Sequence, residues 1–288
     1  MKRSTKHALT GYALLTPLLV GFCLFYAWPF GMVLRYSTVE GSGHSQSFVG
    51  LGHYLELLGN QTFCLALGNT VAFLLVGLSL MLCISYAIAL FLQRFAKRSR
   101  ALRSLLLLPY VMPVIGTVLV VDLLFSEAGL GNLLLDALGL PMRDFLHSDI
   151  AFWVVILLYL WKNVGYSVIL ILSGLMAIDD DQYAAAALDG AGRRARFLHI
   201  TAPQTWYSVF FAGVFALINA FKSFREILLI GGDDPHESIY MLQHYINNCF
   251  EKLSYTSMAV ASMLMALIVF IPFLICYRWV MRKEAYKE

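Results

Sequence analysis

The sequence predicts an all-α integral membrane protein with six transmembrane helices and one long loop on the cytoplasmic side. Three observations lead to this fold class. The 288-residue chain is 59% hydrophobic and only 14% charged, whereas a soluble domain carries about 25% charged residues. Six stretches are apolar over roughly 20 residues, the length that crosses a bilayer core of about 30 Å. Basic residues gather in alternate connections between these stretches.

We expect a single transmembrane domain over residues 1–288, with spans near residues 8–34, 66–92, 104–125, 150–172, 206–230 and 258–281. Polar residues interrupt the fourth and fifth spans. Prolines lie inside the first, third and sixth spans, where each removes a backbone donor and favours a kink that shapes a pathway. A tolerated bend near a helix end is the alternative. These prolines are Pro17, Pro109, Pro113 and Pro272.

Lys and Arg assign the sides of the membrane, because short cytoplasmic loops retain these residues during insertion. Most of the 21 Lys and Arg residues precede the first span, separate the second from the third or the fourth from the fifth, or follow the sixth. They are Lys2, Arg3, Lys6, Arg94, Lys97, Arg98, Arg100, Arg103, Arg193, Arg194, Arg196, Arg278, Arg282, Lys283 and Lys287. The other connections hold only Arg35, Arg143 and Lys252. We therefore expect a multi-pass protein of the cell (plasma or inner) membrane with both termini in the cytoplasm.

The longest cytoplasmic connection, about residues 173–205, has helical content of its own. Residues 182–188 include four alanines and favour a helix, and Asp179 to Asp181 suit its N-terminal cap. Gly190 suits its C-terminus, where a left-handed residue is needed. Residues 193–200 predict a second short helix, and Pro203 is expected to close the loop. Two helices with an apolar and basic face would suit the docking of a soluble partner; a solvated loop that only fixes topology is the alternative.

The segment QYAAAALDGAGRRARFLHITAP resembles the cytoplasmic loop of permease subunits from binding-protein-dependent ABC importers, in which it forms coupling helices that dock on an ATPase subunit. The residues that fit the pattern in register are Ala185, Ala186, Asp189, Gly190, Ala191, Phe197, Ile200 and Pro203. Ala184 replaces the usual glutamate, which puts one polar contact in doubt. With Arg193 of the basic run, these residues form our candidate coupling site.

Further segments resemble the carbohydrate-type, maltose- and glycerol-phosphate-like, subfamily of these permeases. They include GYALLTPLLVGFCLFYAWPF, LLLLPYVMPVIG and LLIGGDDPHESIYMLQHYINNCFE. The resemblance covers nearly the whole chain and implies the type I importer permease fold. It also implies a sugar or sugar-derived solute, a second homologous permease, two ATPase subunits and an extracytoplasmic binding protein. ATP and Mg²⁺ would be bound by the ATPase subunits, and this chain would bind no cofactor.

Charged and amide residues within the fifth span are candidates for the solute pathway. Asn219, Lys222 and Glu226 are spaced i, i+3 and i+7, which places them on one helical face. Intramembrane charges usually face a bundle interior or a cavity, so this face is expected to line the route. Lys222 and Glu226 could also pair directly. The alternative is a structural ion pair near the membrane interface, with Lys222 and Arg225 snorkelling.

The fourth span contributes a second candidate group. Trp161, Asn163 and Tyr166 combine aromatic rings with an amide, next to Lys162 and Gly165. Aromatic faces and amides match the C–H faces and hydroxyl rims of sugars. An interfacial aromatic belt would produce the same composition.

The chain lacks the GxxxxGK[ST] phosphate-binding motif, so ATP hydrolysis is expected on a separate subunit. No motif predicts a catalytic residue, no His/Cys spacing predicts a metal site, and a net charge of +3 gives no reason to expect nucleic acid. Two other classes remain open, a secondary transporter driven by an ion gradient and a polytopic membrane enzyme. Within the importer class, glycerol phosphate, polyamine or amino acid cargo also remain open.

Overall fold

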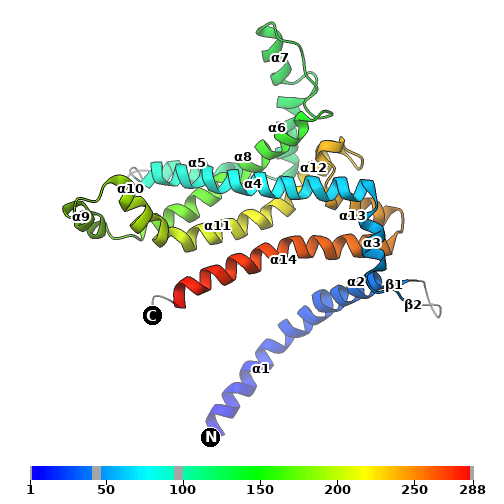
Figure 1. Ribbon diagram of the computed structural model, residues 1–288, viewed down its shortest axis with the longest axis horizontal. Coiled ribbons are helices and arrows are strands. Elements are labelled where there is room, and N and C mark those ends of the chain that lie inside the picture. The colour runs from blue at the N-terminus through cyan, green and yellow to red at the C-terminus, as the bar shows by residue number, and fades with distance from the viewer. Residues whose placement is uncertain (1, 41–46, 94–99, 286–288) are drawn as a thin grey trace. The chain divides into compact units, whose positions relative to one another are not determined.

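The computed structural model describes residues 2–40, 47–93 and 100–285, and the side chains of residues 11–40, 47–93 and 102–278. Within these described ranges, six helices are long and apolar enough to cross a membrane (Figure 1). They are Gly11–Thr38, Gln61–Gln93, Val114–Ala137, Ile150–Met176, Arg193–Gly231 and Tyr255–Arg278. The predicted all-α fold with six crossings is therefore confirmed. Arg94, Lys97, Arg98 and Lys287, part of the charge argument for orientation, lie outside the described residues.

The chain forms two compact units, of which unit 1 comprises Met1–Cys64 and Tyr245–Leu267. The hydroxyl of Tyr54 donates to Ser37 Oγ at 2.9 Å, and Phe63 packs edge-on against Tyr245. Asn60 Oδ1 accepts from the backbone amide of Phe63, which caps the helix that begins there. The elements of unit 1 are α1 (Lys2–Phe22), the π-helix η1 (Cys23–Ala27), α2 (Trp28–Thr38), the antiparallel pair β1 (Val39–Glu40) and β2 (Ser47–Phe48), α3 (Gly52–Leu58), the start of α4 (Gln61–Gln93), most of α13 (Leu242–Glu251) and the first part of α14 (Tyr255–Ala285).

Unit 2 comprises Leu65–His244 and Ile268–Glu288 and holds the main core. Its central element is α8, which is the most buried of the six crossings. Tyr159 of α8 packs edge-on against Phe73 of α4 and donates its hydroxyl to the carbonyl of Ala216 in α11. Besides most of α4, the start of α13 and the last part of α14, the elements of unit 2 are α5 (Arg100–Val111), α6 (Val114–Phe125), α7 (Leu130–Ala137), α8 (Ile150–Met176), α9 (Asp180–Leu188), α10 (Arg193–Arg196), the π-helix η2 (Phe197–Thr201), α11 (Ala202–Lys222), α12 (Phe224–Gly231) and the 3-10 turn η3 (Glu237–Ile239).

The third predicted span, residues 104–125, is not one helix. Pro113 has an extended ψ of 152° and separates α5 from α6. The break follows from sterics, because a proline disfavours helical geometry in the residue before it, here Met112. The membrane-crossing stretch is instead Val114–Ala137, which continues through α7. Pro109 lies inside α5 without ending it.

Two other prolines are accommodated by a local widening of the helix. Pro29 and Pro203 each lie in the first turn of a helix that directly follows a π-helix. At both places a backbone amide reaches five residues back, from Trp28 to Cys23 O and from Ala202 to Phe197 O. Because a proline ring clashes with the carbonyl four residues before it, the wider turn lets the helix continue.

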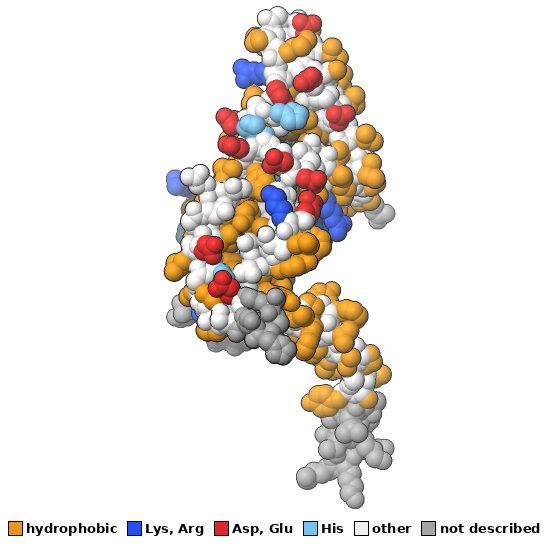
Figure 2. All heavy atoms as spheres, turned by 90° about the vertical axis from the view of Figure 1, so that its right-hand side faces the viewer, with side chains coloured by type: hydrophobic (Ala, Val, Ile, Leu, Met, Phe, Trp, Pro, Cys, Tyr) orange, Lys and Arg blue, Asp and Glu red, His pale blue; other side chains and the backbone are white. Residues whose placement is uncertain are grey.

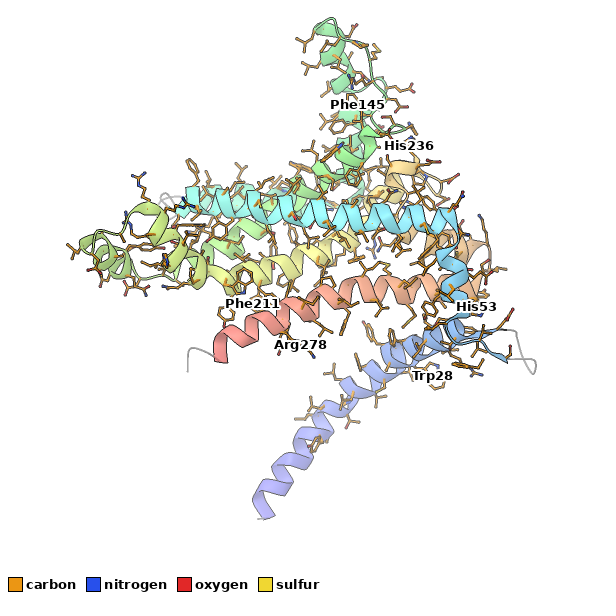
Figure 3. The ribbon with its side chains drawn as sticks, in the orientation of Figure 1. Trp28, His53, Phe145, Phe211, His236 and Arg278 are labelled. Carbon is orange, nitrogen blue, oxygen red and sulfur yellow. The ribbon has the colours of Figure 1, made fainter. Side chains whose placement is uncertain are left out.

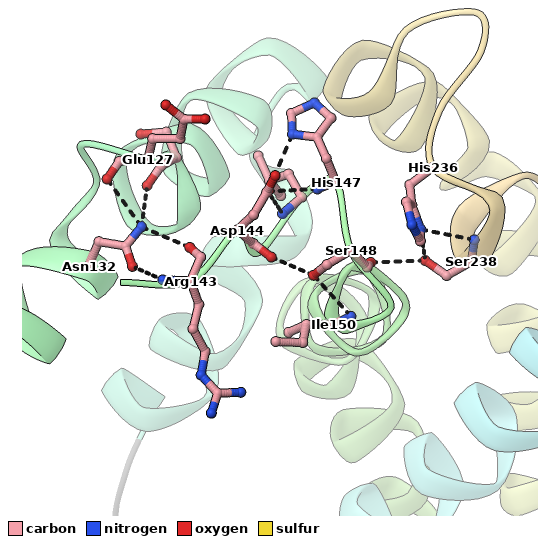
Figure 4. Close-up of polar contacts among 11 residues, drawn as sticks. Glu127, Asn132, Arg143, Asp144, His147, Ser148, Ile150, His236 and Ser238 are labelled. Atoms are coloured by element: carbon pink, nitrogen blue, oxygen red, sulfur yellow. Dashed lines mark hydrogen bonds and ion pairs between the residues drawn. The ribbon is translucent and has the colours of Figure 1, made fainter. Parts of the chain in front are cut away.

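The end of unit 2 at α7 is tied together by polar contacts (Figure 4). Asn132 Nδ2 donates to the carbonyls of Glu127 and Arg143 at 3.1 and 3.0 Å. The backbone amide of His147 donates to Asp144 and holds the pKa of that carboxyl below its usual value. Phe145 packs edge-on against Phe125 of α6 (Figure 3). These contacts fix the loop between α7 and α8.

Large apolar side chains are widely exposed, as expected for helices that face lipid. Leu105 of α5 and Ile115 and Leu119 of α6 are examples. Figure 2 shows hydrophobic side chains at the surface around α7 as well, at the top of that view. Acidic and histidine side chains lie beside them.

Candidate functional site

The candidate coupling site, residues 184–203, folds as a helix, a turn and a second helix; we call it the coupling segment. Asp179 caps α9 by accepting from the amide of Asp181 at 3.1 Å. Gly190 has φ +79°. The amide of Ala191 donates to Ala186 O at 2.9 Å and that of Gly190 to Ala187 O at 3.1 Å. This pair of bonds is the Schellman arrangement, so the predicted cap and glycine turn are both present.

The second helix of the coupling segment differs from the prediction. Residues 193–200 do not form a separate short helix, and Pro203 does not close the loop. Instead α10, η2 and α11 run on without a break from Arg193 to Lys222, within the membrane-crossing stretch Arg193–Gly231. The π-helix η2 makes this possible, because it removes the clash that Pro203 would otherwise cause.

Side-chain contacts join the two helical arms around the coupling segment to each other and to α4. Tyr183 of α9 and Thr201 of η2 are hydrogen-bonded through their hydroxyls at 3.0 Å, and Gln182 is hydrogen-bonded to Gln204. Phe197 packs edge-on against Tyr86 of α4, with ring centroids 5.9 Å apart. The ring of Phe197 therefore faces the chain's own α4.

Two large apolar side chains of this region, both leucines that sequence reasoning missed, are exposed. Leu188 is 90% exposed at the end of α9, and Leu198 is 50% exposed in η2. The predicted site residues Ala184, Ala185, Asp189 and Arg193 are also exposed, whereas Ala186, Ala191 and Ile200 are half-buried. Leu188 directly precedes the Asp-Gly of the motif, a position that could have singled it out.

The second candidate site is a cavity of about 770 Å³ in unit 2. Predicted pathway residues Asn163, Asn219, Lys222 and Glu226 all line it. We call it the polar cavity. Its other lining residues are Tyr110, Val114, Lys162, Leu217, Ile218, Phe221, Ser223, Phe224, Arg225, Gln243 and Val269.

The ion pair in the polar cavity joins different residues from those considered in the sequence. Glu226 contacts Lys162 of α8 through Oε1, rather than Lys222 one turn before it. The two side chains are only 5% and 14% exposed. Packing of α8 against α11, which α12 follows in the chain, brings Lys162 to this carboxylate, an effect that spacing along one helix cannot predict. Within the part of the chain that the structure describes, Glu226 Oε2 has no hydrogen-bond partner.

The amides of the cavity are positioned by the backbone. Asn163 is 4% exposed and donates Nδ2 to Tyr159 O at 2.9 Å, which leaves its side-chain carbonyl free to accept. Gln243 donates Nε2 to Phe221 O at 3.1 Å and keeps an acceptor in the same way. Gln243 lies beyond the fifth span, so neither hydropathy nor spacing pointed to it.

Two of the predicted pathway residues do not line the polar cavity. Trp161 is 40% exposed on α8. Tyr166 stacks on Tyr110 of α5, with ring centroids 4.7 Å apart, and meets Phe215 of α11 edge-on. Tyr110, which does line the cavity, is therefore held in place by Tyr166. Lys162 and Arg225 line the cavity but were not among the predicted site residues. Their charges within predicted spans were the signal that could have identified them.

A membrane-crossing bundle that contains a polar cavity, with helical segments exposed at one end, has the architecture of a transport permease. Residues 81–283 match the family described as "Binding-protein-dependent transport system inner membrane component". The chain is 31% identical over 281 residues to the sn-glycerol-3-phosphate transport system permease protein UgpA of Yersinia pestis bv. Antiqua (strain Antiqua), covering 96% of this chain and 95% of that one. It is 30% identical over 238 residues to the trehalose/maltose transport system permease protein MalF of Thermococcus litoralis, covering 81% of each.

The fold resembles a chain in the crystal structure of a bacterial alginate ABC transporter in complex with an alginate pentasaccharide-bound periplasmic protein. The TM-score is 0.83 at 21% identity, over 98% of this chain and 97% of that one. The chain therefore belongs to the family of binding-protein-dependent transport system inner membrane components, and it is a permease of the ABC importer class. The class and fold predicted from the sequence are confirmed, and the secondary transporter and membrane enzyme are not supported.

Proposed function

We propose that this chain forms half of the membrane pathway of an ATP-driven importer for a sugar or sugar-derived solute. A second, homologous permease forms the other half, two ATPase subunits bind ATP and Mg²⁺, and an extracytoplasmic binding protein delivers the solute. Both termini lie in the cytoplasm. The observation that carries the proposal is one unbroken helical stretch, Arg193–Lys222, made of α10, η2 and α11, which begins in the coupling segment and reaches the lining of the polar cavity.

That helix provides a direct mechanical link. The 21 residues of α11 extend over about 30 Å, from Ala202 in the coupling segment to Lys222 in the cavity lining. A closing movement of the ATPase subunits, applied to α9 and α10, would tilt α11 as a rigid element. The residues Asn219 and Lys222 would move with it, which alternates access to the cavity.

The cargo class is supported by two independent features. Relatives in the family are named for sn-glycerol 3-phosphate and for trehalose and maltose. The polar cavity has a volume of about 770 Å³ and offers amide acceptors and ammonium donors to hydroxyl groups. A polyamine is the least favoured cargo, because the one acidic side chain among the lining residues, Glu226, is already paired.

Crosslinking through Leu188 tests the proposed docking of the coupling segment. We expect that a Leu188→Cys variant of the assembled importer, labelled with a short reagent that has one thiol-reactive and one photoreactive end, joins this chain to an ATPase subunit on illumination. Leu188 is exposed at the end of α9, so its replacement costs no internal contact. Mass spectrometry of the crosslinked band identifies the partner.

Leu138→Cys is the matched control for that experiment, since Leu138 is also well exposed but lies at the α7 end of the same unit (Figure 1). The unmodified chain measures the background from its native cysteines. If Leu188→Cys joined only lipid or the chain itself during turnover, the proposed docking would be wrong.

Gly190→Val is expected to uncouple ATP hydrolysis from transport. A β-branched residue at φ +79° is strained by roughly 1–2 kcal/mol, which disrupts the turn between α9 and α10. Uptake should fall several-fold while the ATPase subunits still hydrolyse ATP. The matched control is Gly192→Val, because Gly192 has φ −67° and ψ 169° and an added Cβ there meets open space. Normal coupled transport in Gly190→Val would contradict the assigned role of the turn.

A further inference from the structure

The described lining of the polar cavity carries excess positive charge. Its charged residues are Lys162, Lys222, Arg225 and Glu226. Because Glu226 is paired with Lys162, the charges of Lys222 and Arg225 are not balanced by this lining. His244, which follows Gln243, adds none near neutral pH, because burial lowers its pKa to about 4.

Lys222 and Arg225 are placed to act on one group. Lys222 ends α11 and Arg225 lies in the first turn of α12, three residues later. Both residues line the polar cavity, and both are exposed. Among the described residues neither side chain has a hydrogen-bond or ion-pair partner.

Two neighbouring cations without an acidic partner repel each other, so they favour a binding partner with negative charge. The Arg guanidinium can bind a phosphate or carboxylate through two parallel hydrogen bonds, and the Lys ammonium adds a point charge. The side-chain carbonyls of Asn163 and Gln243 supply acceptors that suit hydroxyl groups in the same cavity.

We propose that the cargo of this permease is a polyhydroxylated solute with at least one phosphate or carboxylate group, and that Lys222 and Arg225 bind this group in the polar cavity. This inference rests on the proposed function, because it takes the cavity to lie on the cargo's route. It narrows the cargo from sugar-derived solutes in general to acidic ones.

The test uses the complete importer in nanodiscs of phosphatidylcholine, without the binding protein, so that only the membrane subunits are probed. Thermal unfolding is measured with two matched pairs of probes, glycerol 3-phosphate against glycerol and glucuronate against glucose. We expect the acidic member of at least one pair to raise the Tm and the neutral members to leave it unchanged, because ligands that bind the folded state stabilise it. The double variant Lys222→Gln/Arg225→Gln should weaken the affinity about ten-fold or more.

Arg278→Gln is the matched control, since it also removes an exposed cation of unit 2 but lies on α14 outside the cavity lining (Figure 3). It should keep the response to the acidic probe. A response equal in both variants, or an equal response to neutral and acidic probes, would overturn the inference.

A second arm separates a solute from a lipid headgroup. The same measurements are repeated in nanodiscs that contain phosphatidylglycerol. If this lipid raised the Tm through Lys222 and Arg225 while the acidic probes added nothing in either bilayer, the anion would be a lipid and the inference would be wrong. If neither lipid nor probe acted, the two cations would be paired within the importer, which also overturns it.

Failure of this inference is distinguishable from failure of the proposed function. ATP hydrolysis stimulated by the loaded binding protein reports the proposed function, and it is measured in the wild-type importer. Stimulation by a neutral solute, with no effect of the acidic probes, would refute the acidic cargo alone. Absence of any stimulation would refute the proposed function.

Discussion

The single substitution Lys162→Met is expected to destabilise the protein by about 3–5 kcal/mol, and the double substitution Lys162→Met/Glu226→Leu to recover most of that loss. The side chain of Glu226 is 5% exposed and forms an ion pair with Lys162. Removing Lys162 leaves a buried carboxylate without compensation. Replacing both residues removes the uncompensated charge together with the desolvation cost of the pair.

Thermal unfolding of the purified chain in a mild detergent measures this difference. Lys252→Met is the matched control, because it makes the same chemical change at an exposed position and should leave the Tm nearly unchanged. Equal losses in the Lys162→Met variant and in the double variant would show that the pair contributes packing rather than charge compensation.

Gly165→Ala should destabilise the contact between α5 and α8 by roughly 1–3 kcal/mol or more. A Cβ at Gly165 would lie 1.8 Å from the carbonyl oxygen of Leu106, a backbone atom that cannot rotate away. Helix α5 must therefore shift. Since Tyr110 of α5 stacks on Tyr166 and lines the polar cavity, we also expect uptake to fall.

The control for that substitution is Gly213→Ala on α11. There an added Cβ meets Leu82 at 3.7 Å, an ordinary van der Waals distance, and the change favours the helix by up to about 1 kcal/mol. Thermal unfolding and uptake are measured for both variants. If the two behaved alike, the close approach of α5 to α8 would not limit stability.

The elements that the sequence predicts well depend on local composition. The number of crossings follows from apolar length, and the cap at Asp179 and the turn at Gly190 follow from residues within a few positions of each other. Their energetics are local, because hydrogen bonds within one helix and its caps involve neighbours in the chain. The break at Pro113 also has a local cause, although only the structure shows that the helix ends there and does not merely bend.

Apolar length in the sequence thus determines the six membrane-crossing helices found among the described residues, and local residue patterns determine the helix and turn of the coupling segment. Only the tertiary structure decides that Lys162 rather than Lys222 pairs with Glu226, that Phe197 faces α4, and that Gln243 joins the polar cavity. The physical reason is that tertiary packing sets how each helix is rotated about its own axis and how far it is shifted along its neighbours. Hydropathy and spacing fix which residues share a face of one helix, whereas the packing of helices against each other fixes which faces meet.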